Sequence, residues 1–355
     1  MCPSIQYIMS NNKKPCALLI NDIHVSKDNI AEFHANWEEA ISICKERAIQ
    51  DIIVGGDLWL SRSSQTLNTL LAVRQALIKA THAGITVTLA EGNHDKVDQE
   101  SLLGYSHVYS EYPHVYVVDD YTVLEYGDKL VLYVMSYFPE DGSFVSRLND
   151  ILDNDFDSYK YNVLYIHEGI NGALATANAK ELPSKIFQDF NAVLVGHYHN
   201  RCKIKGSNIE YIGSSRQHNF GEDEAKGYTV LYTDGSYEFV ENKVNLRYKV
   251  IELSPAQITN QLLEQFAELN SGNYKIKTRI NCDTTEVSGI DKQLLLDAGV
   301  TKVEIVTERI EACDIKSHSL EQKFDKSGIK KEYVSFCNGK EISSEMGLKY
   351  LDKIN

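Results

Sequence analysis

The sequence is poor in cysteine, lacks long apolar runs and has fewer basic than acidic residues. Its seven cysteines are an odd number without a Cys-x-x-Cys pair, which argues against a disulfide framework and for a reducing interior. No apolar run approaches the length of about 18 residues that a membrane span needs. The chain also does not open with a basic, apolar and small-residue signal. We therefore expect a cytoplasmic protein without membrane association.

The charge balance argues against nucleic-acid binding by the chain as a whole. It has 36 Lys and Arg against 50 Asp and Glu, and its formal net charge is −14. Non-specific affinity for DNA comes largely from Lys and Arg side chains that displace counterions. A bound metal ion nevertheless often dominates the local field, so the net charge does not decide what one site binds. At 355 residues and 43% hydrophobic, the chain is long enough for one large domain and one or two smaller units.

What the chain does have is five apolar, strand-like segments that each run into potential metal ligands. In open α/β sheets, side chains just beyond the carboxyl ends of strands line one crevice, so these segments are expected to converge. The residues that follow the five segments are Asp22-Ile23-His24, Gly56-Asp57, Gly92-Asn93-His94-Asp95, His167 and Gly196-His197-Tyr198-His199.

The ligand types indicate two metal ions. Asp22 and His24 are spaced i, i+2, as are His197 and His199, so in an extended segment each pair lies on one side. Asp57 has two carboxylate oxygens and is predicted to bridge the ions. We expect one ion on Asp22, His24, Asp57 and His199, and the other on Asp57, Asn93, His167 and His197. Nitrogen and oxygen ligands without thiolate suit Mn, Fe, Zn or Mg and do not select among them.

Two metal ions about 3.5–4 Å apart are suited to displacement at phosphorus, which makes phosphoester hydrolysis the expected chemistry. His94 is not needed as a ligand and is therefore the predicted general acid. A nearby carboxylate, Asp95 or Asp98, is expected to hold its imidazole. The other histidines lack this context and are predicted to be surface or loop residues: His34, His82, His107, His114, His218 and His318.

Taken together, the five motifs resemble the calcineurin-like metallophosphoesterase superfamily over about residues 15–250. A further stretch is similar to the SbcD branch, the bacterial and phage exonucleases of DNA double-strand-break repair. It consists of Tyr211-Ile212-Gly213-Ser214, Phe220-Gly221-Glu222 and Lys226-Gly227-Tyr228. The resemblance implies an α/β fold, the four-layer αββα sandwich, and a metal-dependent exonuclease and endonuclease of DNA repair and recombination.

The same resemblance implies the cofactors and partners. It assigns the metal ligands given above and two divalent ions, with Mn²⁺ as the first expectation and Mg²⁺, Fe²⁺ and Zn²⁺ as alternatives. The expected partners are DNA, a second copy of the chain and an SbcC-like ATPase with a long coiled coil. One position departs from the superfamily pattern, because Leu60 stands where an Asp or His usually supports the catalytic histidine. Either Asp95 substitutes, or the rate is reduced, or activity depends on the partner.

The chain is predicted to have three parts. Residues 1–250 form the phosphoesterase domain, with helices near 37–48 and 67–80 and with hairpins among the strands between 115 and 135. Residues 251–315 resemble a capping domain in place and size. Its first strand alternates Lys275, Lys277 and Arg279 with less polar residues, which makes a basic face that is either solvated or a DNA-contact strip.

Residues 316–355 are predicted to form a helical tail. It carries two short amphipathic patterns, which either pack on themselves or bind the ATPase partner. Two other functions stay open at this stage. One is a stand-alone phosphatase or cyclic-nucleotide phosphodiesterase, and the other is a catalytically silent scaffold on the same fold.

Overall fold

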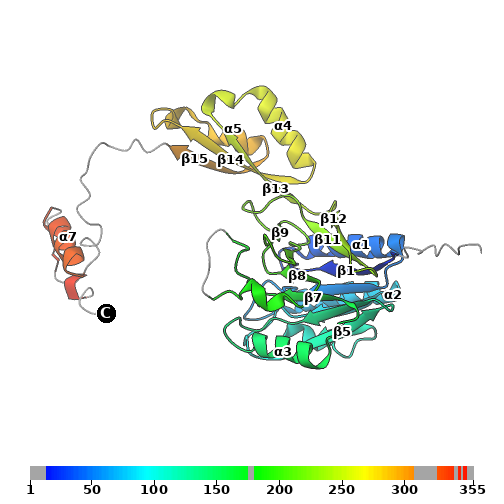
Figure 1. Cartoon of the computed structure of the whole chain (residues 1–355). Helices are drawn as coiled ribbons and strands as arrows, with labels where there is room; N and C mark the ends of the chain where they lie inside the picture. Colours follow the sequence, from blue (N-terminus) through cyan, green and yellow to red (C-terminus); the bar gives the residue numbers. More distant parts are fainter. Residues whose placement is uncertain (1–12, 175–179, 308–325, 340–342, 345–346, 350–355) are drawn as a thin grey trace, which may run out of the picture. The chain divides into compact units, whose positions relative to one another are not determined.

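The computed structural model describes residues 13–174, 180–307, 326–339, 343–344 and 347–349. The chain divides into two compact units, one of residues 1–281 and 286–306 and one of residues 282–285 and 307–355. Figure 1 shows the elements in sequence colours. Among the described residues, no helix is both long and apolar enough to cross a membrane.

Two six-stranded mixed sheets form the centre of the larger unit. The first has the order β12-β11-β1-β2-β3-β4, and the second has the order β5-β6-β7-β8-β10-β9. The strands of the first sheet are β1 (Pro15–Ile20), β2 (Asp51–Gly55), β3 (Thr86–Ala90), β4 (Val115–Val118), β11 (Gly227–Tyr232) and β12 (Tyr237–Glu241). Those of the second are β5 (Tyr121–Tyr126), β6 (Leu130–Met135), β7 (Tyr161–His167), β8 (Ala192–Gly196), β9 (Cys202–Lys203) and β10 (Ile209–Tyr211).

The strand sequences explain why the two sheets stack. Side chains alternate between the faces of a strand, and in β1 both faces are apolar. Leu18 and Ile20 join the core under the helices, whereas Ala17 and Leu19 join the core between the sheets. The Tyr165 hydroxyl of β7 also donates to the backbone oxygen of Ile20, 3.0 Å away, which ties the second sheet to the first.

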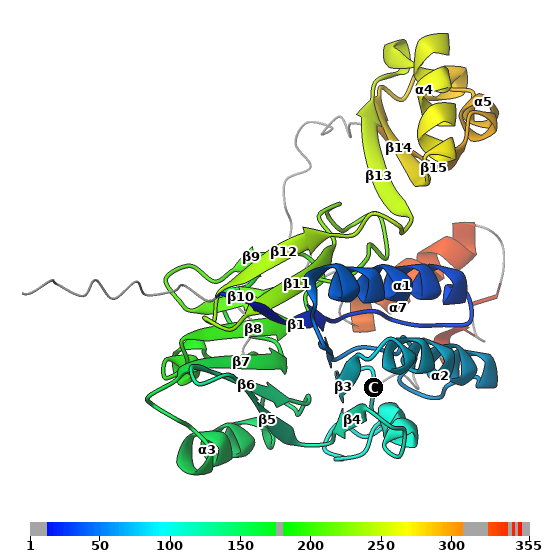
Figure 2. The same ribbon diagram turned by 90° about the vertical axis from the view of Figure 1, so that its right-hand side faces the viewer.

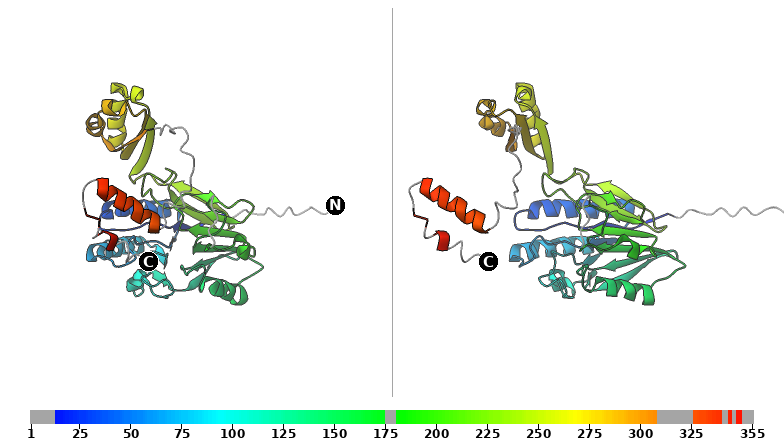
Figure 3. Two further views of the ribbon diagram at one scale, coloured as in Figure 1. Left: turned by 90° about the vertical axis from the view of Figure 1, so that its left-hand side faces the viewer. Right: turned by 60° about the vertical axis from the view of Figure 1, so that its left-hand side comes forward.

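Helices cover the outer faces of both sheets. Figures 2 and 3 show α1 (Ile30–Arg47) and α2 (Leu67–His82) on the first sheet, and α3 (Phe144–Asn154) belongs to the core on the outer face of the second. Four layers follow, which confirms the predicted αββα sandwich. The hairpin prediction is right for β5 and β6, which pair antiparallel, and wrong for β4. That strand pairs parallel with β3, because the chain crosses between the sheets after Val118.

A third, small sheet follows. Its order is β13-β14-β15, and β13 and β14 are parallel. The predicted boundary at residue 250 lies inside β13. The elements of this part are β13 (Arg247–Leu253), α4 (Asn260–Ser271), β14 (Tyr274–Cys282), α5 (Lys292–Asp297) and β15 (Val300–Thr307). Short 3₁₀ helices complete the chain at Tyr105–Tyr109, Ser184–Phe187, Pro255–Gln257 and Val287–Gly289.

In the predicted tail the structure describes α7 (Lys326–Gly339). Within it, the Cys337 side chain is buried and Phe336 is 60% exposed. The first amphipathic pattern begins at Leu320 and Phe324, which lie outside the described residues, as do Met346, Tyr350 and Leu351 of the second. An apolar side chain on α7 is therefore left in contact with solvent.

Candidate metal centre

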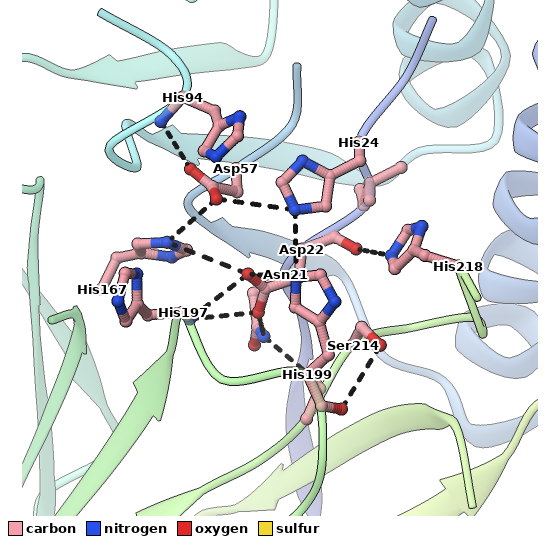
Figure 4. A network of polar contacts seen from close by, with 12 residues as sticks. Asn21, Asp22, His24, Asp57, His94, His167, His197, His199, Ser214 and His218 are labelled. Carbon is pink, nitrogen blue, oxygen red and sulfur yellow. Dashed lines mark hydrogen bonds and ion pairs between the residues drawn. The ribbon is translucent and has the colours of Figure 1, made fainter. Parts of the chain in front are cut away.

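The predicted ligands meet at one edge of the sandwich. The strands β1, β2 and β3 run parallel, as do β7 and β8, so the five carboxyl ends point the same way within each sheet. The side chains that follow these strands face one another across the seam between the sheets (Figure 4). The structure thus brings together all seven predicted ligands: Asp22, His24, Asp57, Asn93, His167, His197 and His199.

Asp57 lies at the middle of this cluster. Its Oδ1 accepts a hydrogen bond from the backbone N–H of His94, 2.8 Å away. Its Oδ2 lies 3.3 Å from the His167 Nε2 and 3.6 Å from the His24 Nε2, which are predicted to hold different ions. A carboxylate oxygen between the two sets of ligands is what a bridging role requires, and the bridge itself stays a prediction.

The orientation of three imidazoles shows that they fit a cation. The Nδ1 of His24 lies 3.3 Å from the Trp59 carbonyl, that of His167 lies 3.1 Å from the Gly55 carbonyl, and that of His199 lies 2.9 Å from the Glu222 carboxylate. Carbonyl and carboxylate oxygens only accept, so each neutral imidazole carries its hydrogen on Nδ1 and points an Nε2 lone pair inward. These three lone pairs point toward the predicted ions.

Two of these lone pairs nearly touch. The Nε2 atoms of His24 and His199 are 3.1 Å apart, and the buried Nε2 of His167 has no hydrogen-bond partner among the described residues. With neutral rings, facing lone pairs repel unless a cation lies between them. The His167 Nε2 faces the Asp57 Oδ2 at 3.3 Å, and the two atoms form an ion pair when the imidazole is protonated. The donor atoms therefore fit metal ions better than they fit one another.

The remaining three predicted ligands, Asp22, Asn93 and His197, are in contact through His197. The Nδ1 of His197 lies 3.1 Å from the Oδ1 of Asn93, and the backbone N–H of His197 donates to the Asp22 carboxylate over 3.1 Å. Three overlapping groups each have their donor atoms within 4.8 Å of one another: Asp22, Asp57 and His167; His24, Asp57 and His94; His24, His199 and His218. Asp57 belongs to the first two groups, as a shared carboxylate would, and the second group also includes His94, the predicted general acid.

The backbone is strained at four of the ligands. Asp22, His24, Asp57 and His197 have φ values of 51°, 52°, 52° and 87°, a region that residues other than glycine rarely occupy. Each such residue costs on the order of 1–3 kcal/mol and persists only where its surroundings enforce it. The chain must turn abruptly at the strand ends to aim these side chains across the seam.

Opposing charges and burial set the pKa values in the centre. Burial alone would lower the pKa of His167, but the Asp57 and Asp22 carboxylates raise it to about 9. Burial would raise the pKa of Asp57, and the His167 and His24 imidazoles instead lower it. His24 is governed by burial, which lowers its pKa to about 4. Asp57 is thus a carboxylate at neutral pH.

The predicted support of His94 has a different geometry. The His94 Nδ1 lies 2.8 Å from the backbone oxygen of Leu60, so a carbonyl replaces the side chain that the superfamily pattern has there. Asp95 is buried and accepts from the backbone N–H groups of Gly92 and Trp59, at 2.6 and 2.9 Å. Asp95 therefore holds the loops that carry His94 and Asp57, and it does not replace the missing side chain at Leu60.

Three residues at the site are not apparent as site residues from the sequence. Glu222 holds the His199 imidazole, and the sequence marks it only as part of a family signature. Arg216 is 3% exposed and His218 is half-buried, and both line the metal cleft. His218 lies in a loop, as expected, but it is not remote from the centre, because its ring packs against His24 and His199 with centroids 5.1 and 4.9 Å apart.

The cleft above the centre has a volume of 560 Å³. Besides the ligands and His94, its walls include side chains from the third sheet. Apart from histidines, the basic and aromatic residues that line the cleft are Arg62, Arg216, Lys275 and Tyr248. Of these, Lys275 and Tyr248 belong to the third sheet.

Comparison with known proteins agrees with this geometry. Residues 17–201, just over half of the chain, match the calcineurin-like phosphoesterase family, and the chain belongs to that family. It is therefore a metal-dependent phosphoesterase, and its buried His and Asp groups are consistent with a site for two metals.

Individual relatives are more distant. The chain is 28% identical over 237 residues to a protein of Invertebrate iridescent virus 6 named as a phosphoesterase, 244L, and the match covers 64% of this chain and 80% of the viral protein. It is 21% identical over 310 residues to the SbcD component of the SbcCD nuclease from Staphylococcus saprophyticus, a match that covers 69% of this chain and 80% of that protein. Among solved structures, Pseudomonas putida nuclease MPE is 17% identical with a TM-score of 0.28, over 61% of this chain and 84% of that one.

Proposed function

We propose that this chain is a two-metal DNA phosphodiesterase, the nuclease subunit of a cytoplasmic SbcC–SbcD-like repair and recombination complex. The observation that carries the proposal is the wall of the cleft. Lys275 of β14 and Tyr248 of β13 line it, and both lie outside residues 17–201, which match the family. A phosphate monoester needs no such second wall. A lysine and an aromatic ring beside the metal centre fit a longer polyanion with bases that stack.

Two divalent ions bound by the seven ligands would acidify water and neutralise charge on the phosphoryl oxygens. The protein's own residues bind and orient these groups and move one proton. His94 lines the cleft and is not among the seven, and the Leu60 carbonyl fixes its Nδ1–H. In the imidazolium form, its Nε2–H is therefore the group that donates a proton to the departing alkoxide, which leaves the neutral Nδ1–H imidazole.

A substrate panel tests the proposal. The full chain is incubated with Mn²⁺ and a phosphate monoester, a cyclic nucleotide or linear duplex DNA. We expect cleavage of DNA to dominate, and His94→Gln to reduce kcat by about 10²–10⁴-fold while leaving metal content unchanged. Faster turnover of the monoester or the cyclic nucleotide would favour a stand-alone phosphatase. Absence of bound metal would favour a silent scaffold.

The proposed partners are a second copy of the chain and a coiled-coil ATPase. The staphylococcal relative is named as one subunit of a nuclease, SbcCD. The exposed Phe336 on α7 supports a contact made by the tail, since an apolar side chain of this size is better buried. We assign residues 251–315 to capping and 316–355 to ATPase binding.

A further inference from the structure

The segment from Gly213 to His218 forms hydrogen bonds to residues 21–24, which are called the ligand loop below. The segment itself supplies none of the predicted ligands. It follows β10 and is buried up to Gln217. Its contacts begin at Asn21, which directly precedes the ligand Asp22. The Asn21 side-chain amide donates to the Gly213 carbonyl over 2.9 Å, and the Ser215 N–H donates to the Asn21 carbonyl over 3.3 Å.

Arg216 and His218 continue this contact along the next three residues. The Nη2 of Arg216 donates to the backbone oxygens of Ile23 and His24, at 3.1 and 3.4 Å. The Nε2 of His218 donates to the backbone oxygen of Asp22 over 2.8 Å, a contact visible in Figure 4. Every carbonyl of the ligand loop therefore has a partner in the 213–218 segment.

The opposite side of the ligand loop is held by the loop that carries Asp57. The N–H groups of Asp22 and His24 donate to the carbonyls of Gly56 and Asp57, at 3.1 and 3.0 Å. The ligand loop thus lies between two other loops: the Asp57 loop accepts from its N–H groups, and the 213–218 segment donates to its carbonyls. Because Asp22 and His24 both have positive φ, contacts on both sides are needed to hold this conformation.

We propose that Arg216 and His218 are positioning residues that fix the Asp22–His24 ligand pair and so set the affinity of the first metal ion. The inference deepens the two-metal site proposed above and rests on it. Neither side chain needs to touch the substrate for this role.

The chemistry of Arg216 suits it to the task. Its guanidinium is buried, and its Nη1 pairs with the Glu32 carboxylate of α1 at 3.0 Å, which compensates the buried charge. The planar fork reaches Glu32 and two consecutive carbonyls at once, which a single ammonium does not do equally well. The ligand loop is thereby tied to the first helix.

Gln217, which lies between the two positioning residues, contacts a different element. Its amide donates to the Tyr248 carbonyl over 2.9 Å and accepts from the Tyr248 N–H over 2.8 Å. The residue between the two positioning residues therefore holds β13, which lines the cleft. The same Gln217 amide also donates to the backbone oxygen of Glu222 over 2.9 Å, so Gln217 joins β13 to the residue that holds the His199 imidazole.

Titration of the full chain with Mn²⁺ alone tests the proposal. We expect Arg216→Met and His218→Phe to weaken one of two Mn²⁺ sites by about 10–100-fold in calorimetry, as loss of groups that orient ligands does elsewhere. The paramagnetic resonance spectrum at two equivalents should change from a coupled pair toward an isolated ion. Arg216→Lys should recover part of the affinity.

Arg147→Met is the matched control, because it removes a shielded arginine that pairs with Asp120 and lies far along the chain from the ligand loop. It should bind two ions as the original chain does.

The proposal would be overturned if folded His218→Phe and Arg216→Lys bound Mn²⁺ at both sites with wild-type affinity. Arg216→Met, where it folds, would then also be unaffected. Circular dichroism establishes folding, and the milder His218→Phe and Arg216→Lys keep the test open if Arg216→Met unfolds. The titration contains no substrate. A chain that binds two ions but cleaves no DNA therefore refutes the nuclease and leaves this inference standing.

Discussion

At Asp57, the two oxygens of one carboxylate have different tasks. Oδ1 is held by the His94 N–H, and only Oδ2 faces the imidazoles of His24 and His167. Asp57→Asn keeps the shape but removes the negative charge that both ions would share. We expect binding of both ions to fall together, measured as Mn²⁺ stoichiometry by calorimetry. Retention of two ions at unchanged affinity would refute the bridge.

Glu222 acts at one remove from the metal. Its carboxylate accepts from the His199 Nδ1 and from the N–H of His218, so it fixes both the tautomer and the ring orientation. Glu222→Gln should lower Mn²⁺ affinity by about 10–100-fold at one site. Asp223→Asn is the control, because that neighbouring side chain is 47% exposed and pairs with Lys226 instead of His199. Equal effects of the two variants would show a general charge effect instead.

His167 predicts a pH dependence of metal binding. Burial would lower its pKa, but Asp57 and Asp22 raise that pKa to about 9, so without metal the imidazole holds a proton at pH 7. A metal must displace that proton, and apparent affinity should rise about tenfold per pH unit from pH 7 toward 9 and then level off. Calorimetry in buffers of different ionisation enthalpy measures the released proton. A flat affinity between pH 7 and 9 would contradict this assignment.

The ligand types were predictable at this scale, and their surroundings were not. Asp22, His24 and His199 stand out because each follows an apolar strand. Nothing in the local sequence of His218 predicts its contact with the centre, since it meets Asp22 across 196 positions of the chain. The sequence shows that Leu60 departs from the superfamily pattern. It does not show that the Leu60 backbone carbonyl contacts His94, because every residue type has a carbonyl.

At the scale of elements, the three basic residues of β14 have different contacts. Lys277 lies 2.6 Å from the Glu304 carboxylate, and Arg279 lies 2.9 and 3.3 Å from Glu252 and Glu304. Lys275 instead lines the metal cleft. The basic strip predicted from alternation is therefore largely paired within the third sheet, and one lysine is directed at the proposed substrate.

We expect Lys275→Gln to weaken duplex binding and to reduce the slope of log affinity against log salt by about one. Lys277→Gln should change neither quantity, because its charge is already paired. Filter binding at several salt concentrations measures both. An equal loss of duplex affinity in the two variants would show that the whole basic face contacts DNA. Unchanged affinity in both would show that the face is only solvated.

Secondary structure was predictable where apolar spacing was regular. The helix expected at 67–80 corresponds to α2, whereas that expected at 37–48 begins seven residues earlier, at Ile30. The first two turns of α1 bury only Phe33 and Asn36 before Trp37, so the apolar signal there is sparse. The exchange of β4 and β5 between sheets depends on long-range packing, which alternation within one strand does not report.

For the whole molecule, the net charge of −14 leads us to expect tight DNA binding only together with the proposed partner. We expect the chain alone to bind duplex weakly at physiological salt, and a chain truncated after Lys316 to lose the ATPase while it still binds metal. Co-purification from the native host, with identification of any large coiled-coil ATPase, provides the measurement. If the truncated chain still bound the ATPase, the docking surface would have to lie outside the tail.

The seam between the two sheets has one last consequence. Asp22, His24 and Asp57 follow strands of one sheet, and His167, His197 and His199 belong to or follow strands of the other. Ions bound by these residues would therefore link the two sheets. Ligand binding that is confined to the native state adds about 2.7 kcal/mol when free ligand exceeds Kd a hundredfold. Removal of the ions by a chelator should therefore weaken the packing of the two sheets on each other, so the ions proposed for catalysis would also stabilise the fold.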